Sequence, residues 1–280
     1  MSARALGLLL ALAAGSVAAQ TTLVDAARND DHAAAMGLLA ERADPNQAES
    51  DGTTPLHWAV HNDDAELVQR LLAAGANVAA ANDYGATPMS EAAVAANPAV
   101  LEALLKAGAD VDSPNADGQT ALMVVARTGR VDAARLLLEH GARVNAHESF
   151  GGQTALMWAA AQKHPDMIRL LLENGADVDA RGTAHDWERR VTSEPRIKIM
   201  QTGGFTPLLY AAREGCAACV EPLVAGGADV DLSDPYGMTP LVLALYNRQF
   251  DTAVAPGLTT STSGLPSVKP RSPGSLRSGG

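Results

Sequence analysis

Short apolar stretches separated by polar turns recur along most of this chain. The unit that begins at Thr54 predicts a first helix ending near His61, because the Thr54 hydroxyl can cap a helix and Pro55 suits its first position. A second helix then starts near Asp64 and ends at Gly75, with one apolar face made by Leu67, Val68, Leu71 and Leu72. Gly75 fits the left-handed conformation that ends such a helix. Each unit leaves apolar surface on both sides, so only stacking of units can bury it.

Two sequence markers repeat in phase. The first is the Thr-Pro-Leu-His-Trp-Ala stretch at Thr54, with related stretches starting at Thr87, Thr120, Thr154, Thr206 and Thr239; the steps are 33, 33, 34, 52 and 33 residues. The second is a Gly-Ala-x-Val stretch that starts at Gly75, Gly108, Gly141, Gly175 and Gly227. Such periodicity identifies a repeat architecture.

These markers resemble the ankyrin repeat, whose units have about 33 residues and a Thr-Pro-Leu-His-x-Ala stretch. The resemblance covers roughly residues 21–250, and more narrowly the chain resembles secreted bacterial ankyrin-repeat proteins. It implies an all-α repeat solenoid of helix–turn–helix units joined by hairpin-like loops, here with one long insertion. It also implies that His57 forms a structural hydrogen bond between neighbouring repeats.

The predicted organisation follows from these markers. We expect a signal peptide over 1–19, an N-terminal capping repeat over 20–49, repeats over 50–82, 83–115, 116–148 and 149–182, an inserted finger loop over 183–203, a repeat over 204–234, an incomplete terminal repeat over 235–255 and a disordered Ser/Pro/Gly tail over 256–280.

The terminal repeats diverge from the pattern. We expect the first unit to lack the Thr-Pro pair, and Arg42 replaces its turn glycine. The last unit starts its second helix near Phe250, but Pro256-Gly257 stops it. This predicts an unsealed apolar edge, where terminal repeats normally need a polar face. Two interpretations remain open: a truncated or frame-shifted longer array, or a natural end that the tail seals.

The first residues have the pattern of a secretory signal peptide. A basic start is followed by an apolar run over Ala5–Ala14 and small residues at Val17-Ala18-Ala19. A short buried helix or a membrane anchor is the alternative, but the run is about half of the roughly 20 residues needed to cross a bilayer. We therefore expect a periplasmic or secreted protein without a membrane span.

The 52-residue step exceeds the regular 33 by 19, which places an insertion between the fourth and fifth regular units. From Arg181 to Gly204 there are five basic and three acidic residues, a net charge of +2. Insertions in repeat proteins lie in loops of one face, which is often the binding face. The alternation in Arg196–Ile199 predicts a short strand, and hence a hairpin. Whether Trp187 contacts a partner or only packs on the neighbouring repeat remains open.

Composition and charge exclude one further class of function, nucleic-acid binding. Hydrophobic residues make up 47% of the chain and aromatic residues 4%, as suits small, closely packed helices. Residues 20–250 contain 17 basic and 31 acidic residues, a net charge of −14. An acidic body repels phosphate backbones, so no nucleic-acid binding is expected.

No constellation of residues indicates catalysis. A Gly-rich phosphate loop and a Gly-x-Ser-x-Gly stretch are both absent from the sequence. His57 and His61 have a spacing that zinc proteases use, but Trp58 stands where those enzymes have glutamate. For Cys216 and Cys219, two thiols, a structural disulfide, and redox or metal chemistry all remain open. We expect no catalytic residues, no metal ligands and no cofactor.

The expected function is protein–protein interaction through the concave surface of loops and inner helices, together with the inserted finger. The candidate contact residues are Tyr84, Gln119, Arg127, Phe150, Gln153, Trp187, Arg189, Arg190, Phe205, Arg213 and Tyr236. The alternative for the loop aromatics is packing on neighbouring loops, and Trp58, Trp158 and Tyr210 are expected to serve packing. The competing functions are an inhibitor or accessory subunit of a periplasmic enzyme and, more remotely, an enzyme. We expect a monomer unless the open C-terminal edge self-associates.

Overall fold

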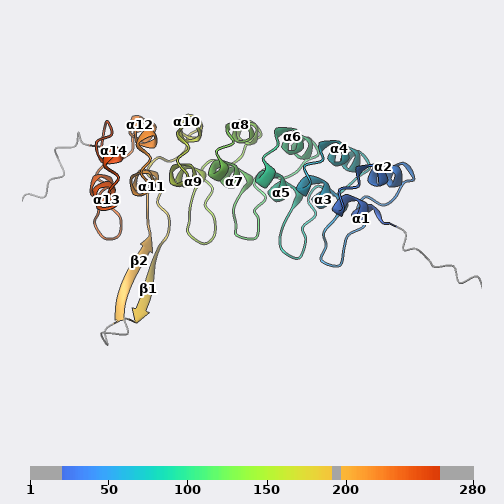
Figure 1. Ribbon diagram of the computed structural model, residues 1–280, viewed down its shortest axis with the longest axis horizontal. Coiled ribbons are helices and arrows are strands. Elements are labelled where there is room, and N and C mark those ends of the chain that lie inside the picture. The colour runs from blue at the N-terminus through green and yellow to red at the C-terminus, as the bar shows by residue number, and fades with distance from the viewer. Residues whose placement is uncertain (1–20, 191–196, 259–280) are drawn as a thin grey trace, which may run out of the picture.

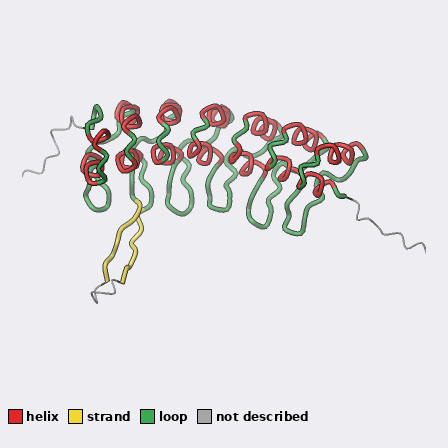
Figure 2. The backbone as a smooth tube through the Cα atoms, viewed as in Figure 1, coloured by secondary structure: helices red, strands yellow, loops and turns green. Residues whose placement is uncertain are grey.

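A computed structural model describes residues 21–190 and 197–258, with side chains placed outside 185–202. Its helices form two rows, and hairpin-like loops extend from the inner row on the side away from the outer row (Figure 1; Figure 2). The inner helices are α1 (Leu23–Arg28), α3 (Pro55–His61), α5 (Pro88–Ala95), α7 (Ala121–Thr128), α9 (Ala155–Ala161), α11 (Pro207–Glu214) and α13 (Pro240–Tyr246). The outer helices are α2 (His32–Ala40), α4 (Ala65–Ala73), α6 (Pro98–Lys106), α8 (Val131–Glu139), α10 (Pro165–Glu173), α12 (Ala217–Ala225) and α14 (Phe250–Ala253). The predicted all-α solenoid is confirmed.

Threonine starts the inner helices. The Thr54 hydroxyl accepts a hydrogen bond from the His57 backbone N–H, and Thr87, Thr154 and Thr206 cap α5, α9 and α11 in the same way. The first unit has this cap too, because Thr22 forms a capping box with Asp25 at the start of α1. The prediction that the first unit lacks its threonine was therefore wrong; only the proline is absent.

The last turn of α2 shows how the first unit manages without a turn glycine. Arg42 occupies the position of Gly75 and adopts a φ of +64°, against +93° for the glycine. A side chain in this left-handed region costs free energy, roughly 1–2 kcal/mol. The conformation is thus imposed by the surrounding repeat frame rather than by the residue.

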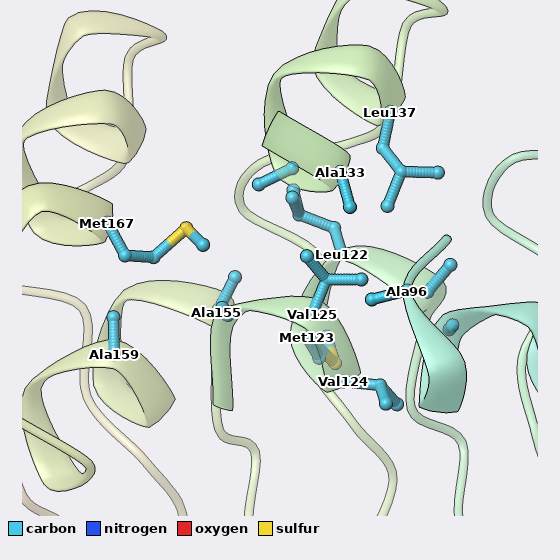
Figure 3. Packing of buried hydrophobic residues seen from close by; sticks show 14 of the residues in the cluster. Ala96, Leu122, Met123, Val124, Val125, Ala133, Leu137, Ala155, Ala159 and Met167 are labelled. Atoms are coloured by element: carbon cyan, nitrogen blue, oxygen red, sulfur yellow. The ribbon is translucent and has the colours of Figure 1, made fainter. Parts of the chain in front are cut away.

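The core lies between the two helix rows and continues through the stack. Leu122 and Val125 of α7 point toward Ala133 and Leu137 of α8, and all four side chains are buried (Figure 3). Alanine occupies the same buried place in most inner helices, with 0–1% exposure at Ala59, Ala92, Ala159, Ala211 and Ala244. The small side chain lets neighbouring inner helices approach each other closely, which explains the alanine-rich composition.

Polar side chains join successive loops along the outer edge of the stack. Asn145 donates to the Gly175 carbonyl and accepts from the Asp177 N–H, at 3.0 and 2.8 Å. In the same way the Asn77 N–H donates to the Asn46 side-chain oxygen, and the Arg143 N–H donates to the Asp112 carboxylate. These bonds satisfy backbone groups in turns that have no helix or sheet partner.

An antiparallel hairpin forms the insertion. Strand β1 (Ala184–Arg190) pairs with β2 (Ile197–Gly203), from Ala184 opposite Gly203 to Arg190 opposite Ile197. The strand expected from the alternation in 196–199 is present from Ile197 onward. The hairpin extends further from the helices than the other loops do (Figure 1).

The last unit is short, and its outward side carries apolar side chains. α14 has four residues, and Tyr246, Phe250 and Val254 are 76%, 61% and 72% exposed. The predicted tail begins at Pro256, yet Leu258 is only 4% exposed and belongs to the core cluster. Packed structure therefore extends at least to Leu258, which corrects the predicted start of the tail. The rest of the predicted tail and the predicted signal peptide lie outside the described residues.

His57 links two repeats, as the resemblance implied. Its Nδ1 faces the Thr54 hydroxyl at 2.8 Å, and its Nε2 faces the Ala86 carbonyl oxygen of the next unit at 3.1 Å. A neutral ring that donates from Nε2 to the carbonyl and accepts at Nδ1 satisfies both contacts. Burial lowers the pKa of His57 below 6.5, which favours that neutral form.

We expect replacement of Leu137 by alanine to lower the free energy of unfolding by about 2–5 kcal/mol, because it leaves a cavity at a fully buried position. Urea unfolding followed by circular dichroism measures the loss. The same truncation at Leu245, which is 49% exposed, serves as the control and should cost much less. Equal losses for the two variants would contradict the assignment of the core.

His57 should make stability depend on pH. Between pH 6.5 and the lowered folded-state pKa, the unfolded chain binds a proton that the folded chain does not. The contribution of His57 is therefore complete above pH 6.5 and declines as the pH falls through this window. His57→Asn should cost about 1–3 kcal/mol at pH 7.5 and less at pH 5, by urea unfolding at both values. A cost that grows at low pH would show that the folded state prefers charged His57.

Candidate interaction surface

Three aromatic side chains project from the tips of separate loops. Tyr84, Phe150 and Tyr236 are 71%, 76% and 57% exposed. Asx-type turns hold the tips in place; the Asn82 and Asp234 side chains accept the backbone N–H groups of Tyr84 and Tyr236 at 3.1 and 2.9 Å. Exposed aromatic residues on fixed turns are well suited to contact a partner, because little side-chain entropy is lost on binding.

Phe205 differs from the other predicted loop aromatics. It is only partly exposed and packs edge-to-face on Tyr210, with ring centroids 5.4 Å apart. Arg213 lies over both rings at 5.0 Å, and the Gln153 amide donates to the Tyr210 hydroxyl. The structure thus brings Gln153, Phe205 and Arg213 together around Tyr210, so that Phe205 follows the packing alternative rather than full exposure.

Arg127 and Gln119 both lie in the repeat over 116–148. Arg127 is exposed, and its guanidinium carbon lies 5.7 Å from the centre of the Trp158 ring in the next repeat. The backbone N–H of Gln119 donates to the Asn115 side chain at 2.9 Å, so this residue takes part in its own turn. Trp58 and Trp158 are partly buried and Tyr210 is buried, as expected for residues that serve packing.

Hydrogen bonds from the backbone and from the Arg181 side chain fix the base of the hairpin. The Thr183 N–H donates to the Gly151 carbonyl at 2.7 Å, and Arg181 donates to the carbonyls of Gly204 and Ser233. Gly203 has a φ of +83°, and a Cβ there would lie 2.1 Å from the Thr183 carbonyl oxygen. The predicted contact residues Trp187, Arg189 and Arg190 all lie on β1; their side chains lie outside what the structure describes.

A cavity of about 240 Å³ lies between the second and third units, and sequence reasoning did not find it. Trp58 and His61 of α3 and Tyr84 of the next loop tip provide ring walls, while Asp51 and Glu91 provide carboxylates. Glu91 occupies the place in its unit that Trp58 and Trp158 occupy in theirs. That exchange of an aromatic residue for an acid was the available signal in the sequence.

Cys216 and Cys219 form a disulfide, with their Cα atoms 5.2 Å apart. Cys216 occupies the N-cap position of α12 and Cys219 is fully buried in its first turn, so the bond closes the first turn of that helix. Of the three alternatives left open, the structure contains the disulfide. Pro222 in the same helix removes the N–H that would bond the Ala218 carbonyl, and the disulfide strengthens a helix that is otherwise weakened.

Metal ligands are not grouped in the part of the chain described here: no three His, Cys, Asp or Glu side chains could together hold an ion. His140 caps the C-terminus of α8, and its Nδ1 lies 2.9 Å from the Leu136 carbonyl oxygen. None of the helices placed in the structure is both long and apolar enough to cross a membrane.

Reduction of the disulfide should lower the free energy of unfolding by about 2 kcal/mol or less, because the bond closes a loop between residues only three apart. Urea unfolding with and without dithiothreitol measures the difference. The double variant Cys216→Ala/Cys219→Ala is the control and should not respond to the reductant. An unchanged wild-type midpoint, with both thiols shown free by alkylation, would mean that the bond contributes nothing to stability.

Comparison with known proteins supports the repeat assignment. A family model for ankyrin repeats (3 copies) matches residues 23–115, 93–182 and 190–255. The unmatched residues 183–189 coincide with the start of the hairpin. No curated protein sequence matches the chain.

Solved ankyrin structures are similar in fold. The crystal structure of the ankyrin repeat domain of Bcl-3, a member of the IκB protein family, is 29% identical, with a TM-score of 0.65; the match covers 84% of this chain and 98% of that one. The human ASB11 ankyrin repeat domain also has a TM-score of 0.65, at 24% identity, covering 79% of this chain and 90% of that one. Ankyrin repeats are in general protein–protein interaction modules. With family-model matches over most of its length, this chain belongs to the ankyrin-repeat family.

Proposed function

We propose that this chain is an exported binding module whose protein partner contacts both the hairpin and the row of loops and inner helices beside it. The hairpin is the observation that carries this proposal. It replaces an ordinary loop, its base is held by hydrogen bonds from Arg181 and Thr183, and it extends beyond the other loops (Figure 1). A two-stranded projection with a fixed base can enter a partner at a smaller cost in ordering entropy than an unpaired loop of the same length.

Charge favours the hairpin as a contact with a distinct partner surface. The 181–204 segment has a net charge of +2, while residues 20–250 as a whole have −14. A positive projection on a negative body orients the partner during association, because the partner must present acidic residues to the hairpin and basic residues to the body. The Phe205, Tyr210 and Arg213 cluster runs from the end of the hairpin along the next inner helix, α11, where it would extend the contact.

Export is part of the proposal and rests on two observations. Residues 1–19 have the pattern of a signal peptide, and a disulfide joins Cys216 and Cys219. Disulfides persist in oxidising compartments such as the periplasm. The narrower resemblance to secreted bacterial ankyrin proteins agrees with both, and the partner would then be a periplasmic or secreted protein.

The shape of the hairpin favours one second function. A narrow two-stranded projection fits a cleft better than a flat surface, so the chain would inhibit or assist an enzyme whose active site the hairpin enters. Binding alone does not separate this function from a simple adaptor. A change in the activity of the captured enzyme, reversed by removal of the hairpin, separates them.

The exposed apolar edge of the last unit is the surface through which the chain would self-associate. Tyr246, Phe250 and Val254 lie close in sequence on α13, α14 and the turn after them. Clustered exposed apolar residues of this kind promote association. We propose a monomer at low concentration, with this edge as the route to any self-association.

Deletion of residues 184–202 should abolish capture of the partner. It removes the 19 residues that exceed the regular step and restores a spacing of 33 between Thr154 and Thr206. The tagged full chain and this variant are expressed with export, and captured proteins are identified by mass spectrometry. We expect one specific partner with the full chain and at least a tenfold loss, on the order of 1.4 kcal/mol or more, with the variant.

The control is Arg70→Ala on the outer helix α4, away from the hairpin and the loops, which should leave capture unchanged. Both variants are checked for folding by circular dichroism. Equal capture by the chain without the hairpin would remove the hairpin from the interface. Absence of any specific partner for the folded full chain would overturn the proposed function.

A further inference from the structure

The cavity between the second and third units has the size and walls to receive one side chain. Its volume is about 240 Å³, too small for a folded segment. Trp58 and Tyr84 offer ring surface, and the His61 ring stands edge-on to Trp58 with centroids 5.7 Å apart. The cavity opens on the same side as the loop tips, because Tyr84 is itself a loop-tip residue.

The charges that line the cavity are negative. Asp51 and Glu91 supply carboxyl groups, and no lysine or arginine contributes to the lining. Hydrogen bonds from Thr53 hold the pKa of Asp51 below its usual value, while burial keeps His57 neutral. Glu91 lies 3.6 Å from His61 Nδ1, an ion pair only when that imidazole is protonated. Both carboxylates thus line the space that a cation would enter.

In other units of the same chain, an arginine side chain lies over the ring that corresponds to Trp58. Trp158 occupies the same place in its unit as Trp58, and Arg127 of the preceding unit lies over its ring. Arg213 lies over Tyr210, which has the equivalent place one unit further on. Within the described residues these arginines account for every cation–ring contact, and Trp58 has none. The place from which Arg127 reaches Trp158 is held by Arg28 in the unit before Trp58, but the Arg28 guanidinium pairs with Asp25 and Glu49 instead.

We infer that the cavity lined by Trp58, Tyr84 and Glu91 binds an arginine side chain of the partner protein. The guanidinium stacks on the Trp58 ring and lies against the Glu91 carboxylate, with Asp51 adding negative potential at the same mouth. This inference rests on the proposed function and adds the chemistry of the partner, a basic segment that reaches the second and third units. Such a segment also matches the net charge of −14 over residues 20–250.

A defined peptide tests this inference without any knowledge of the partner. The full chain is titrated at pH 8 with acetyl-Gly-Ser-Arg-Ser-Gly-amide, and the indole resonance of Trp58, identified with a Trp58→Phe variant, is followed by NMR. The matched ligand has citrulline in place of arginine, with the same shape and no charge. We expect saturable shifts with the arginine peptide and binding weaker by about tenfold or more with the citrulline peptide.

Glu91→Gln is the decisive variant, because it removes the charge and keeps the shape of the side chain. It should weaken binding of the arginine peptide by about fivefold or more. Glu102→Gln removes the same charge from the outer helix α6, where Glu102 pairs with Lys106, and should leave binding unchanged. Thermal unfolding shows whether both variants are folded.

Three outcomes would overturn the inference. They are no shift of the Trp58 resonance at about 10 mM peptide, equal binding of the arginine and citrulline peptides, and equal effects of the two glutamine variants. Failure here is distinguishable from failure of the proposed function. A chain that captures its partner through the hairpin but ignores the arginine peptide keeps that function and loses only the arginine site.

Discussion

Stacking of identical faces is the constraint on which the rest of this structure depends. A single helix pair cannot bury its apolar surface, so each unit depends on stacking against its neighbours. Alanine at the contact between inner helices, such as Ala159 and Ala211, sets how closely the units approach. The same closeness allows His57 to reach the Ala86 carbonyl of the next unit. The geometry of the surface therefore follows from the packing beneath it.

Because the contacts that hold the units together lie in the helices, the loops are free to vary. The hairpin shows this freedom most clearly. Its base uses only a few hydrogen bonds from Arg181, Thr183 and Gly204, while the helices on both sides keep the regular arrangement. A long projection is added without disturbing the core, and a surface with its own charge is presented beside an acidic body.

The stacking also explains why one structural position takes on different chemistry in different units. At the place of Trp58, Trp158 and Tyr210, the frame supplies an equivalent setting and the residue decides its use. Arg127 and Arg213 cover the rings in the later units, whereas Glu91 and Asp51 flank the ring of Trp58. A repeat protein can thus have, on one surface, rings covered by its own arginines and a ring that no arginine covers. Which of the two arises depends on the residues around each ring.

The sequence alone determined the fold, since the Thr-Pro and Gly-Ala markers recur at the period of one helix pair and local capping rules apply within each unit. It also indicated the insertion and a strand within it. Only the tertiary structure decided which side chains meet across units. It placed Arg127 over Trp158, joined Gln153 to Tyr210 and gathered Asp51, Trp58 and Glu91 around one cavity. Residues more than thirty positions apart come together there through stacking, and no local pattern of propensity or spacing carries that information.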